Sequence, residues 1–444
     1  MRFFFILIFI FFFNNCSFDN KTGIWKNENL NNKEKKNSSN RFKEFKTLST
    51  TIEPFDQTIN LNTDFNLNLL SPEKNFIWLD TFYNTKNNLT NFKYDNLNNL
   101  IFKSKKISRF KLSENLLFDK NKLITNDDKG NIIIYSISEN RVVSKFNFYK
   151  KKFKNIKKKL NFIIENNIVY VSDNLGFLYA LNYQQNKLIW AKNLKIPFNS
   201  NLKLSKNILF ASNQNNDLYF FDKKNGNLLK SIPTEQTIVK NNFINNLSLN
   251  DNSLFFLNTY GSLYSVDIDS MKLKWFLNIN QSLDINPSNL FSGNQITVSN
   301  NKLVVSSNEF TYIIETDSGA VLHKKNFSSK LQPTILNNYL FIVSNNNFLI
   351  IQNLNDGNII YSQNINQLAD QFLETKNKKI NFKKLMIING KIFIFLTNSH
   401  FIKINLNGSV IDVTKLPSRL ESKPIIIDNS LLYLNDSKKL VVIN

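Results

Sequence analysis

Cysteine and histidine are nearly absent from this chain of 444 residues, which contains one Cys and two His. A single cysteine, Cys16, cannot form an internal disulfide, and His323 and His400 are scattered in the sequence, so no zinc or redox site is indicated. The sequence also lacks a phosphate-binding glycine loop and a nucleophile elbow. No cofactor, metal site or catalytic residue is therefore predicted.

The apolar run at the amino terminus is short. It extends from Phe3 to Phe13, follows Met1-Arg2, and is too short to span a bilayer comfortably. This pattern is typical of a signal peptide, which we assign to residues 1–15. Residues 16–75, rich in Asn, Lys, Ser and Thr, are predicted to form a flexible tether.

The position of Cys16, directly after this run, resembles the processing site of bacterial lipoproteins. The resemblance implies that Cys16 is lipidated. Because Ser17 and not Asp follows, it also implies the outer membrane of a Gram-negative bacterium, facing the periplasm. Such sites usually have a small residue where this chain has Asn15, so a spare cysteine in an ordinary signal peptide and an uncleaved anchor remain alternatives.

A turn followed by an alternating strand recurs eight times from about residue 107 to the end. The turn residues have an average spacing of 44 residues, since 308 residues from the first to the last contain seven steps. Each copy except the last has a turn, an apolar strand, a second turn, an alternating strand, and a tight turn such as Asn225-Gly226 before a fourth strand. The eight turn residues are Gly130, Gly176, Asn216, Gly261, Glu309, Asn347, Ser399 and Lys438.

A four-stranded antiparallel unit of this length has the size of a propeller blade. The sequence therefore predicts an all-β fold, an eight-bladed β-propeller over residues 76–444. The last copy ends at Asn444 after its third strand, and Leu100 to Ile107 is a strand without a unit of its own. We expect this N-terminal strand to complete the final blade and close the ring, which removes exposed sheet edges.

The net charge is +22, from 56 Lys and Arg against 34 Asp and Glu. Most basic residues are Lys, and Asn, Ile and Phe are also abundant, so an AT-rich genome is one explanation. Attraction to anionic lipid or nucleic acid is the other. The densest run, Lys150 to Lys159, is predicted to be a solvated loop between blades. No nucleic-acid motif surrounds it, and a signal peptide directs the chain away from nucleic acid.

Two copies carry the most complete repeat, Gly176 to Trp190 and Gly261 to Trp275. This pattern resembles the PQQ-enzyme-like propeller repeat, and its Trp position is filled elsewhere by Lys230, His323 and Tyr361. Together with the lipoprotein-like cysteine, it is similar to the BamB-like lipoproteins of the outer-membrane β-barrel assembly machinery. The resemblance implies a non-enzymatic scaffold that binds a BamA-like insertase, other assembly subunits and unfolded outer-membrane proteins. No partner-binding residue can be named from the pattern.

Two other functions remain open. A quinoprotein-type, PQQ-dependent oxidoreductase uses the same fold and needs carboxylate and amide oxygens around a metal near the axis. However, Asp222, Asp267 and Glu315 fall at one repeated strand end, a position that favours structural hydrogen bonds in the blade turns. A propeller that binds an envelope polymer is the third hypothesis.

Overall fold

The computed structural model describes residues 16–18, 25–27, 55–61, 67–236, 243–280, 291–368 and 381–444. The chain divides into two compact units, Met1–Glu53 and Pro54–Asn444. In the first unit, β1 (Cys16–Phe18) pairs antiparallel with β2 (Trp25–Asn27). The apolar run Phe3–Phe13 and Asn15 lie outside the described residues. No helix in the described part of the chain is long and apolar enough to cross a membrane.

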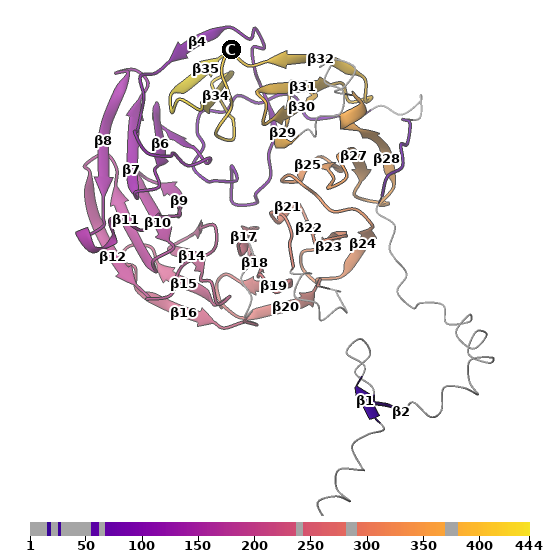
Figure 1. Cartoon of the computed structure of the whole chain (residues 1–444), viewed down its shortest axis with the longest axis horizontal. Coiled ribbons are helices and arrows are strands. Elements are labelled where there is room, and N and C mark those ends of the chain that lie inside the picture. The colour runs from indigo at the N-terminus through magenta and orange to yellow at the C-terminus, as the bar shows by residue number, and fades with distance from the viewer. Residues whose placement is uncertain are drawn as a thin grey trace, which may run out of the picture. The chain divides into compact units, whose positions relative to one another are not determined.

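The second unit is a ring of eight four-stranded antiparallel blades, as predicted (Figure 1). In each blade the first strand lies innermost and the fourth lies at the rim. Blade 1 contains β5 (Leu117–Asp119), β6 (Lys122–Asn126), β7 (Asn131–Ser136) and β8 (Arg141–Asn147). Blade 2 contains β9 (Leu160–Glu165), β10 (Ile168–Asp173), β11 (Phe177–Asn182) and β12 (Lys187–Asn193). The 3-10 turn η2 (Lys151–Phe153) lies between these blades.

The next four blades repeat this order. Blade 3 contains β13 (Lys203–Ser205), β14 (Ile208–Ser212), β15 (Leu218–Asp222) and β16 (Leu228–Ile232). Blade 4 contains β17 (Asn246–Leu249), β18 (Ser253–Leu257), β19 (Ser262–Asp267) and β20 (Leu273–Asn278). Blade 5 contains β21 (Thr297–Ser299), β22 (Lys302–Ser306), β23 (Thr311–Glu315) and β24 (Val321–Lys325). Blade 6 contains β25 (Thr334–Leu336), β26 (Tyr339–Val343), β27 (Phe348–Asn353) and β28 (Ile359–Asn364).

Strands from the N-terminal region join the last two blades. Blade 7 contains β29 (Phe382–Ile388), β30 (Lys391–Leu396), β31 (His400–Ile404) and β32 (Val410–Lys415), and β3 (Asn91–Phe92) pairs with the inner edge of β29. Blade 8 contains β33 (Ile425–Ile427), β34 (Ser430–Leu434), β35 (Leu440–Ile443) and, as its outer strand, β4 (Leu100–Lys103). The predicted closure is confirmed, because β4 pairs antiparallel with β35. The strand ends at Lys103, earlier than the expected Ile107.

The turn between the second and third strands sets the repeat. In seven blades the expected turn residue has a positive φ, which favours Gly and Asn. These residues are Gly130 (82°), Gly176 (85°), Asn216 (69°), Gly261 (93°), Asn347 (66°), Ser399 (71°) and Lys438 (62°). In blade 5 the predicted turn is present, but its residue Glu309 is not among the described residues with positive φ. There the amide of Ser307 donates to the carbonyl of Phe310 (2.8 Å) and closes the turn.

Hydrophobic side chains fill the spaces between consecutive blades. One core cluster joins blades 2 and 3 through residues such as Tyr170, Leu178 and Phe221, and another joins blades 4 and 5 through Phe255 and Val305. Each of these clusters is shared by consecutive blades, as expected for a repeat protein.

The Trp position of the repeat also joins neighbouring blades. The indole of Trp190 in β12 donates to the carbonyl of Lys223 (3.0 Å), and that of Trp275 in β20 donates to the carbonyl of Thr316 (2.9 Å). Both acceptors lie in the tight turn of the next blade. The glycines of these turns, Gly226 and Gly319, leave room for the rings, because an added Cβ would lie 2.5 and 2.7 Å from them.

Candidate functional site

The inner edges of all eight blades are in contact with one segment, residues 75–95, which we call the central coil. In Figure 1 it forms part of the indigo and purple trace inside the ring. The coil starts at blade 8, where Asn75 donates to the carbonyl of Ile426 (2.8 Å), and returns there, where the amide of Asp95 donates to the carbonyl of Asn429 (3.1 Å). Between these points it contacts blades 1 to 7 in order, so it makes one full circuit.

Hydrogen bonds fix the coil to each innermost strand. Trp78 and Phe118 of blade 1 exchange two backbone bonds of 2.8 Å, and the amide of Ile164 in blade 2 donates to the carbonyl of Leu79 (2.9 Å). Lys203 of blade 3 donates to the carbonyl of Asn84 (2.8 Å). The later contacts are Leu249 N to Thr85 O (2.9 Å), Val298 N to Lys86 O (2.9 Å), Asn88 Nδ2 to Ile335 O (2.8 Å), and the pairing of Asn91 and Phe92 with Ile387 and Ile388. The coil thus supplies partners for strand edges that face the axis.

The two ends of the coil pack on each other. The Trp78 ring lies 5.7 Å from the Phe92 ring and 4.8 Å from the Tyr83 ring, and both Trp78 and Phe92 are buried. The ammonium of Lys384, on β29, lies 4.3 Å from the centre of the Trp78 ring and donates to the carbonyl of Pro424 (2.8 Å). Burial, and then the charge of Lys423, hold the pKa of Lys384 well below its ordinary value.

A buried ion pair fixes the middle of the coil. The ammonium of Lys203 lies 2.7 Å from Oδ2 of Asp80, and both side chains are buried. Burial lowers the pKa of Lys203, and the Asp80 carboxylate opposes that shift. Any other position of the coil, or the loss of either side chain, would leave an unpaired charge buried inside the ring, which is costly. The pair therefore favours this position of the coil.

A hollow of about 460 Å³ opens beside the coil. Its lining includes Ile77 and Leu79 from the coil, Ile163 and Ile164 from β9, and Leu204 from β13. Ile77 is half exposed. The hollow is mainly apolar, with Asp80 and Glu165 at its wall, so it can accept an apolar side chain of a partner.

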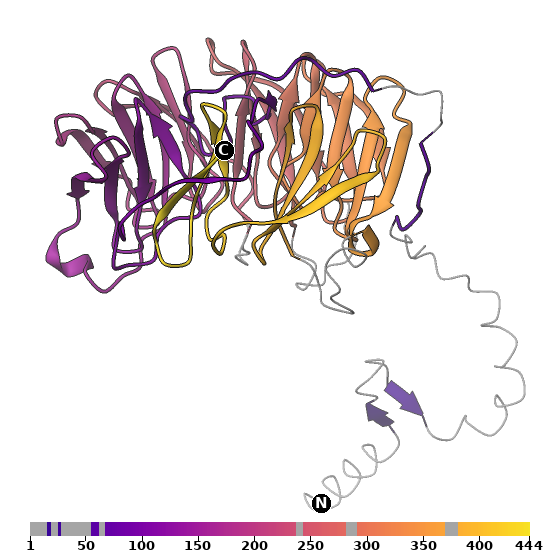
Figure 2. The same ribbon diagram turned by 90° about the horizontal axis from the view of Figure 1, so that it is seen from above.

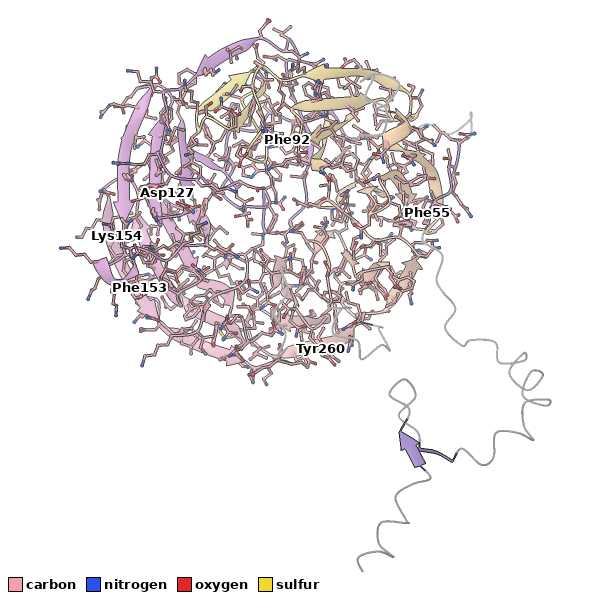
Figure 3. All side chains as sticks on the ribbon, in the orientation of Figure 1. Phe55, Phe92, Asp127, Phe153, Lys154 and Tyr260 are labelled. Carbon is pink, nitrogen blue, oxygen red and sulfur yellow. The ribbon has the colours of Figure 1, made fainter. Side chains whose placement is uncertain are left out.

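The outer edges of the blades are the second candidate surface. One of them is already occupied, because Ile59 pairs antiparallel with Ser362 of β28. Each residue donates its amide to the carbonyl of the other (3.0 Å). Phe55 is buried against Phe327 and Phe348, with ring centres 5.6 and 6.0 Å apart. Residues 55–61, which we call the strap, thus extend the sheet of blade 6, and Figure 3 labels Phe55 at the rim.

The rims of other blades expose apolar side chains on their fourth strands. β24 has three exposed and two half-buried residues, whereas β28, beneath the strap, has no exposed residue. The exposed rim residues are Ile189, Leu228, Leu229, Leu273, Phe276, Val321, Leu322, Ile411, Leu100 and Ile101. Open strand edges with apolar side chains are the surfaces on which an extended peptide adds to a sheet.

The carboxylates singled out in the sequence accept hydrogen bonds within their own turns. Asp222 accepts from the amide of Lys224 (2.8 Å), Asp267 accepts from the amide of Ser270 (2.8 Å), and Glu315 accepts from the hydroxyl of Ser318 (2.5 Å). The bonds from Ser270 lower the pKa of Asp267. These contacts agree with the structural role favoured by their repeated position.

The two histidines lie in different blades. His323 occupies the Trp position of blade 5, where its ring lies against Gly357 and its Nε2 lies 3.3 Å from the carbonyl of Asn355. His400 begins β31. Within the described ranges, no group of three His, Cys, Asp or Glu could hold a metal ion. Cys16 is described only as the first residue of β1.

The sequence did not reveal the central coil or the strap. The signal that could have found the coil is its asparagine content, because an Asn side chain can bond backbone groups of a strand edge. Asn87 is the best case, since its Nδ2 donates to the carbonyls of Leu247 and Ile296 (both 2.9 Å) and so joins blades 4 and 5.

Comparisons with known proteins agree with this architecture. The structure of BamB from Moraxella catarrhalis has a TM-score of 0.62 at 12% identity, covering 78% of this chain and 99% of that one. A quinohemoprotein alcohol dehydrogenase from Comamonas testosteroni has a TM-score of 0.58 at 7% identity, covering 83% of this chain and 80% of that one. A europium-containing methanol dehydrogenase gives 0.58 at 9% identity, covering 83% and 89%.

These likenesses show the shared propeller fold, and no curated protein matches the sequence. A family model described as "Outer membrane protein assembly factor BamB" matches residues 114–363, more than half of the chain. The chain therefore belongs to the family of outer membrane protein assembly factor BamB.

Proposed function

We propose that this protein is a non-enzymatic scaffold of the outer-membrane β-barrel assembly machinery. In this role it binds a BamA-like insertase and other assembly subunits, and assists the insertion of outer-membrane proteins. The family match over residues 114–363 is the observation that carries the proposal. We further propose that residues 1–15 are a signal peptide and that Cys16 carries a lipid anchor at the periplasmic face of the outer membrane.

The open rim strands support a mechanism for binding. Where the strap pairs with Ser362, the chain itself adds an extended segment to a blade edge. A partner strand can add in the same way to a rim without a strap, gaining main-chain hydrogen bonds and pockets for alternate side chains. The anchor keeps the ring near the membrane, so several weak contacts combine into stable binding. Unfolded outer-membrane proteins expose extended segments with unpaired main-chain groups, so they can add to a rim strand in the same way.

The alternative of a quinoprotein-type oxidoreductase is less favoured by the centre of the ring. The inner strand edges bond to the central coil, and Asp222, Asp267 and Glu315 bond within their turns. The protein should therefore show no PQQ-dependent dye reduction when supplied with PQQ and calcium. Turnover in that assay would replace the scaffold proposal with the oxidoreductase.

A photocrosslinking experiment tests binding at the rim. A crosslinking amino acid replaces Leu229 in blade 3 or Leu322 in blade 5, both exposed on fourth strands. The controls place the same group at Ile360 on β28, beneath the strap, and at Lys224 in a tight turn. We expect an adduct with a BamA-like protein from a rim position and not from the controls. Equal adducts from all positions would mean that the rim edges do not bind the partner.

A further inference from the structure

The loop between blades 1 and 2 concentrates positive charge. Seven of its ten residues from Lys150 to Lys159 are lysine. Its backbone has a defined shape, because the amides of Phe153, Lys154 and Ile156 donate to carbonyls three residues earlier (3.0, 3.0 and 3.2 Å). This basic loop, residues 150–159, therefore holds like charges close together on a folded backbone, which an unstructured lysine run would avoid by spreading apart.

Aromatic packing fixes the loop to the ring. The Phe153 ring lies 5.7 Å from the Phe177 ring and 6.5 Å from the Tyr149 ring. Lys158 is the only inward lysine of the loop: its side chain is buried, it bonds the carbonyl of Phe153, and its ammonium lies 5.0 Å from the Tyr149 ring. The other six lysines are exposed. One lysine thus supports the loop, and six are presented to the outside.

A second group of cations lies beside the loop. Arg109, Lys129 and Lys145 come from three separate segments, and their charged groups lie 5.7, 5.8 and 5.9 Å from the centre of the Phe110 ring. The loop lies beside this group because the amide of Lys158 donates to the carbonyl of Asp128 (2.9 Å), the residue before Lys129. We call the six exposed loop lysines and these three cations the basic patch.

Neighbouring carboxylates do not neutralise the surface of the patch. Asp127 and Asp173 are buried, and each accepts hydrogen bonds from amides of its own turn, such as Leu175 N to Asp173 (2.8 Å). Asp173 also accepts a bond from the hydroxyl of Tyr149 (2.5 Å). Asp128 is half-buried. The acids thus serve the turns, and the outward charge of the patch is positive.

We propose that the basic patch docks the propeller on an anionic lipid surface. The loop carries Lys and no Arg, which suits diffuse attraction to a charged surface better than bidentate recognition of one phosphate. Ile156 is 43% exposed between these lysines and can enter the headgroup layer. Figure 3 places Phe153 and Lys154 at the outer rim, and Figure 2 shows the η2 turn projecting from the lower left of the ring. The proposal is independent of insertase binding and of Cys16 lipidation.

Vesicle binding by the full chain tests the proposal. Cosedimentation compares vesicles of phosphatidylcholine with vesicles that also contain about one-third phosphatidylglycerol, by analogy with the anionic surfaces that attract polybasic segments. An apolar amino-terminal segment binds both vesicle types, so the readout is the affinity for the anionic vesicles divided by the affinity for the phosphatidylcholine vesicles. In the variant K151Q/K152Q/K154Q this ratio should fall by about fivefold per lysine at low salt, and high salt should abolish it.

The matched control removes the same charge elsewhere. K187Q/K224Q/K272Q changes three exposed lysines at or next to the tight turns of blades 2, 3 and 4. It should leave the ratio nearly unchanged, whereas Ile156→Ser should weaken binding to the anionic vesicles without a change in charge. An equal loss in the control would attribute binding to net charge and overturn the proposal. Binding to a single-stranded oligonucleotide without a preference for anionic vesicles would overturn it in favour of nucleic acid.

Discussion

Asn87 offers the sharpest test of the central coil. Its side chain is fully buried, and its Nδ2 donates to the carbonyls of Leu247 and Ile296. Asn87→Ala removes both donors and leaves two buried carbonyls without these partners. Each costs about 1–3 kcal/mol, so we expect a loss of about 2–6 kcal/mol in the free energy of unfolding from the hydrogen bonds alone. The residue also has φ of 52°, and Ala adds a strain of about 1–2 kcal/mol there.

Asn166→Ala controls for that strain. Asn166 has φ of 49° on an exposed turn, so its replacement includes the backbone cost without the two buried bonds. Urea unfolding of both variants, followed by tryptophan fluorescence, gives the difference due to the hydrogen bonds. Asn87→Asp should be at least as damaging as Ala, because it places an acceptor against two carbonyls. If Asn87→Ala were no more destabilising than Asn166→Ala, the coil would not join blades 4 and 5 as described.

Three other predictions concern packing and charge. Gly226→Ala should destabilise the protein by about 1–3 kcal/mol more than Gly390→Ala in thermal unfolding. Both glycines have positive φ, but only a Cβ at Gly226 would clash with Trp190. Equal effects of the two substitutions would contradict the contact between blades. Lys384→Met should be more stable than the wild type at neutral pH. The pKa of Lys384 is lowered in the folded state, so the unfolded chain binds more protons up to about pH 10.5. The stability of the wild type therefore rises with pH in that range, and the advantage of the Met variant should shrink. An advantage that is independent of pH in paired denaturation curves would show that Lys384 is not desolvated. Phe55→Ala or Ile59→Pro should release the strap and speed its proteolysis, whereas Asp56→Ala, at an exposed position, should not. Unchanged cleavage in all three variants would show that neither Phe55 nor Ile59 holds the strap on blade 6.

Local pattern was sufficient to predict the ring. Turn residues such as Gly176 and Asn216 accept positive φ, and the short apolar strands between them recur at the length of a propeller blade. The closing strand at Leu100 was found by counting strands, since the last unit lacked one. The turn at Glu309 is closed differently, because the amide of Ser307 donates to the carbonyl of Phe310 and Glu309 is not among the described residues with positive φ.

The coil, the strap and the basic patch could not be predicted because their partners are distant in sequence. Asn87 and Ile296 are 209 residues apart, and Ile59 and Ser362 are 303 apart. In the sequence, the abundance of asparagine is equally consistent with an AT-rich genome, so it does not single out Asn87. The lysine run was visible, but its neighbours around Phe110 come from three separate segments. The longer interval before Ser399 overlaps residues 369–380, which lie outside the described residues.

Copurification from native membranes tests whether the protein acts as a scaffold of the assembly machinery. The tagged full chain is crosslinked in the envelope, purified, and its partners are identified by mass spectrometry, with a Cys16→Ser variant in parallel. We expect recovery of a BamA-like insertase with the wild-type chain and a lower yield with the variant, because the anchor contributes avidity. Repeated recovery of the chain without any BamA-like protein would contradict its role as an assembly scaffold.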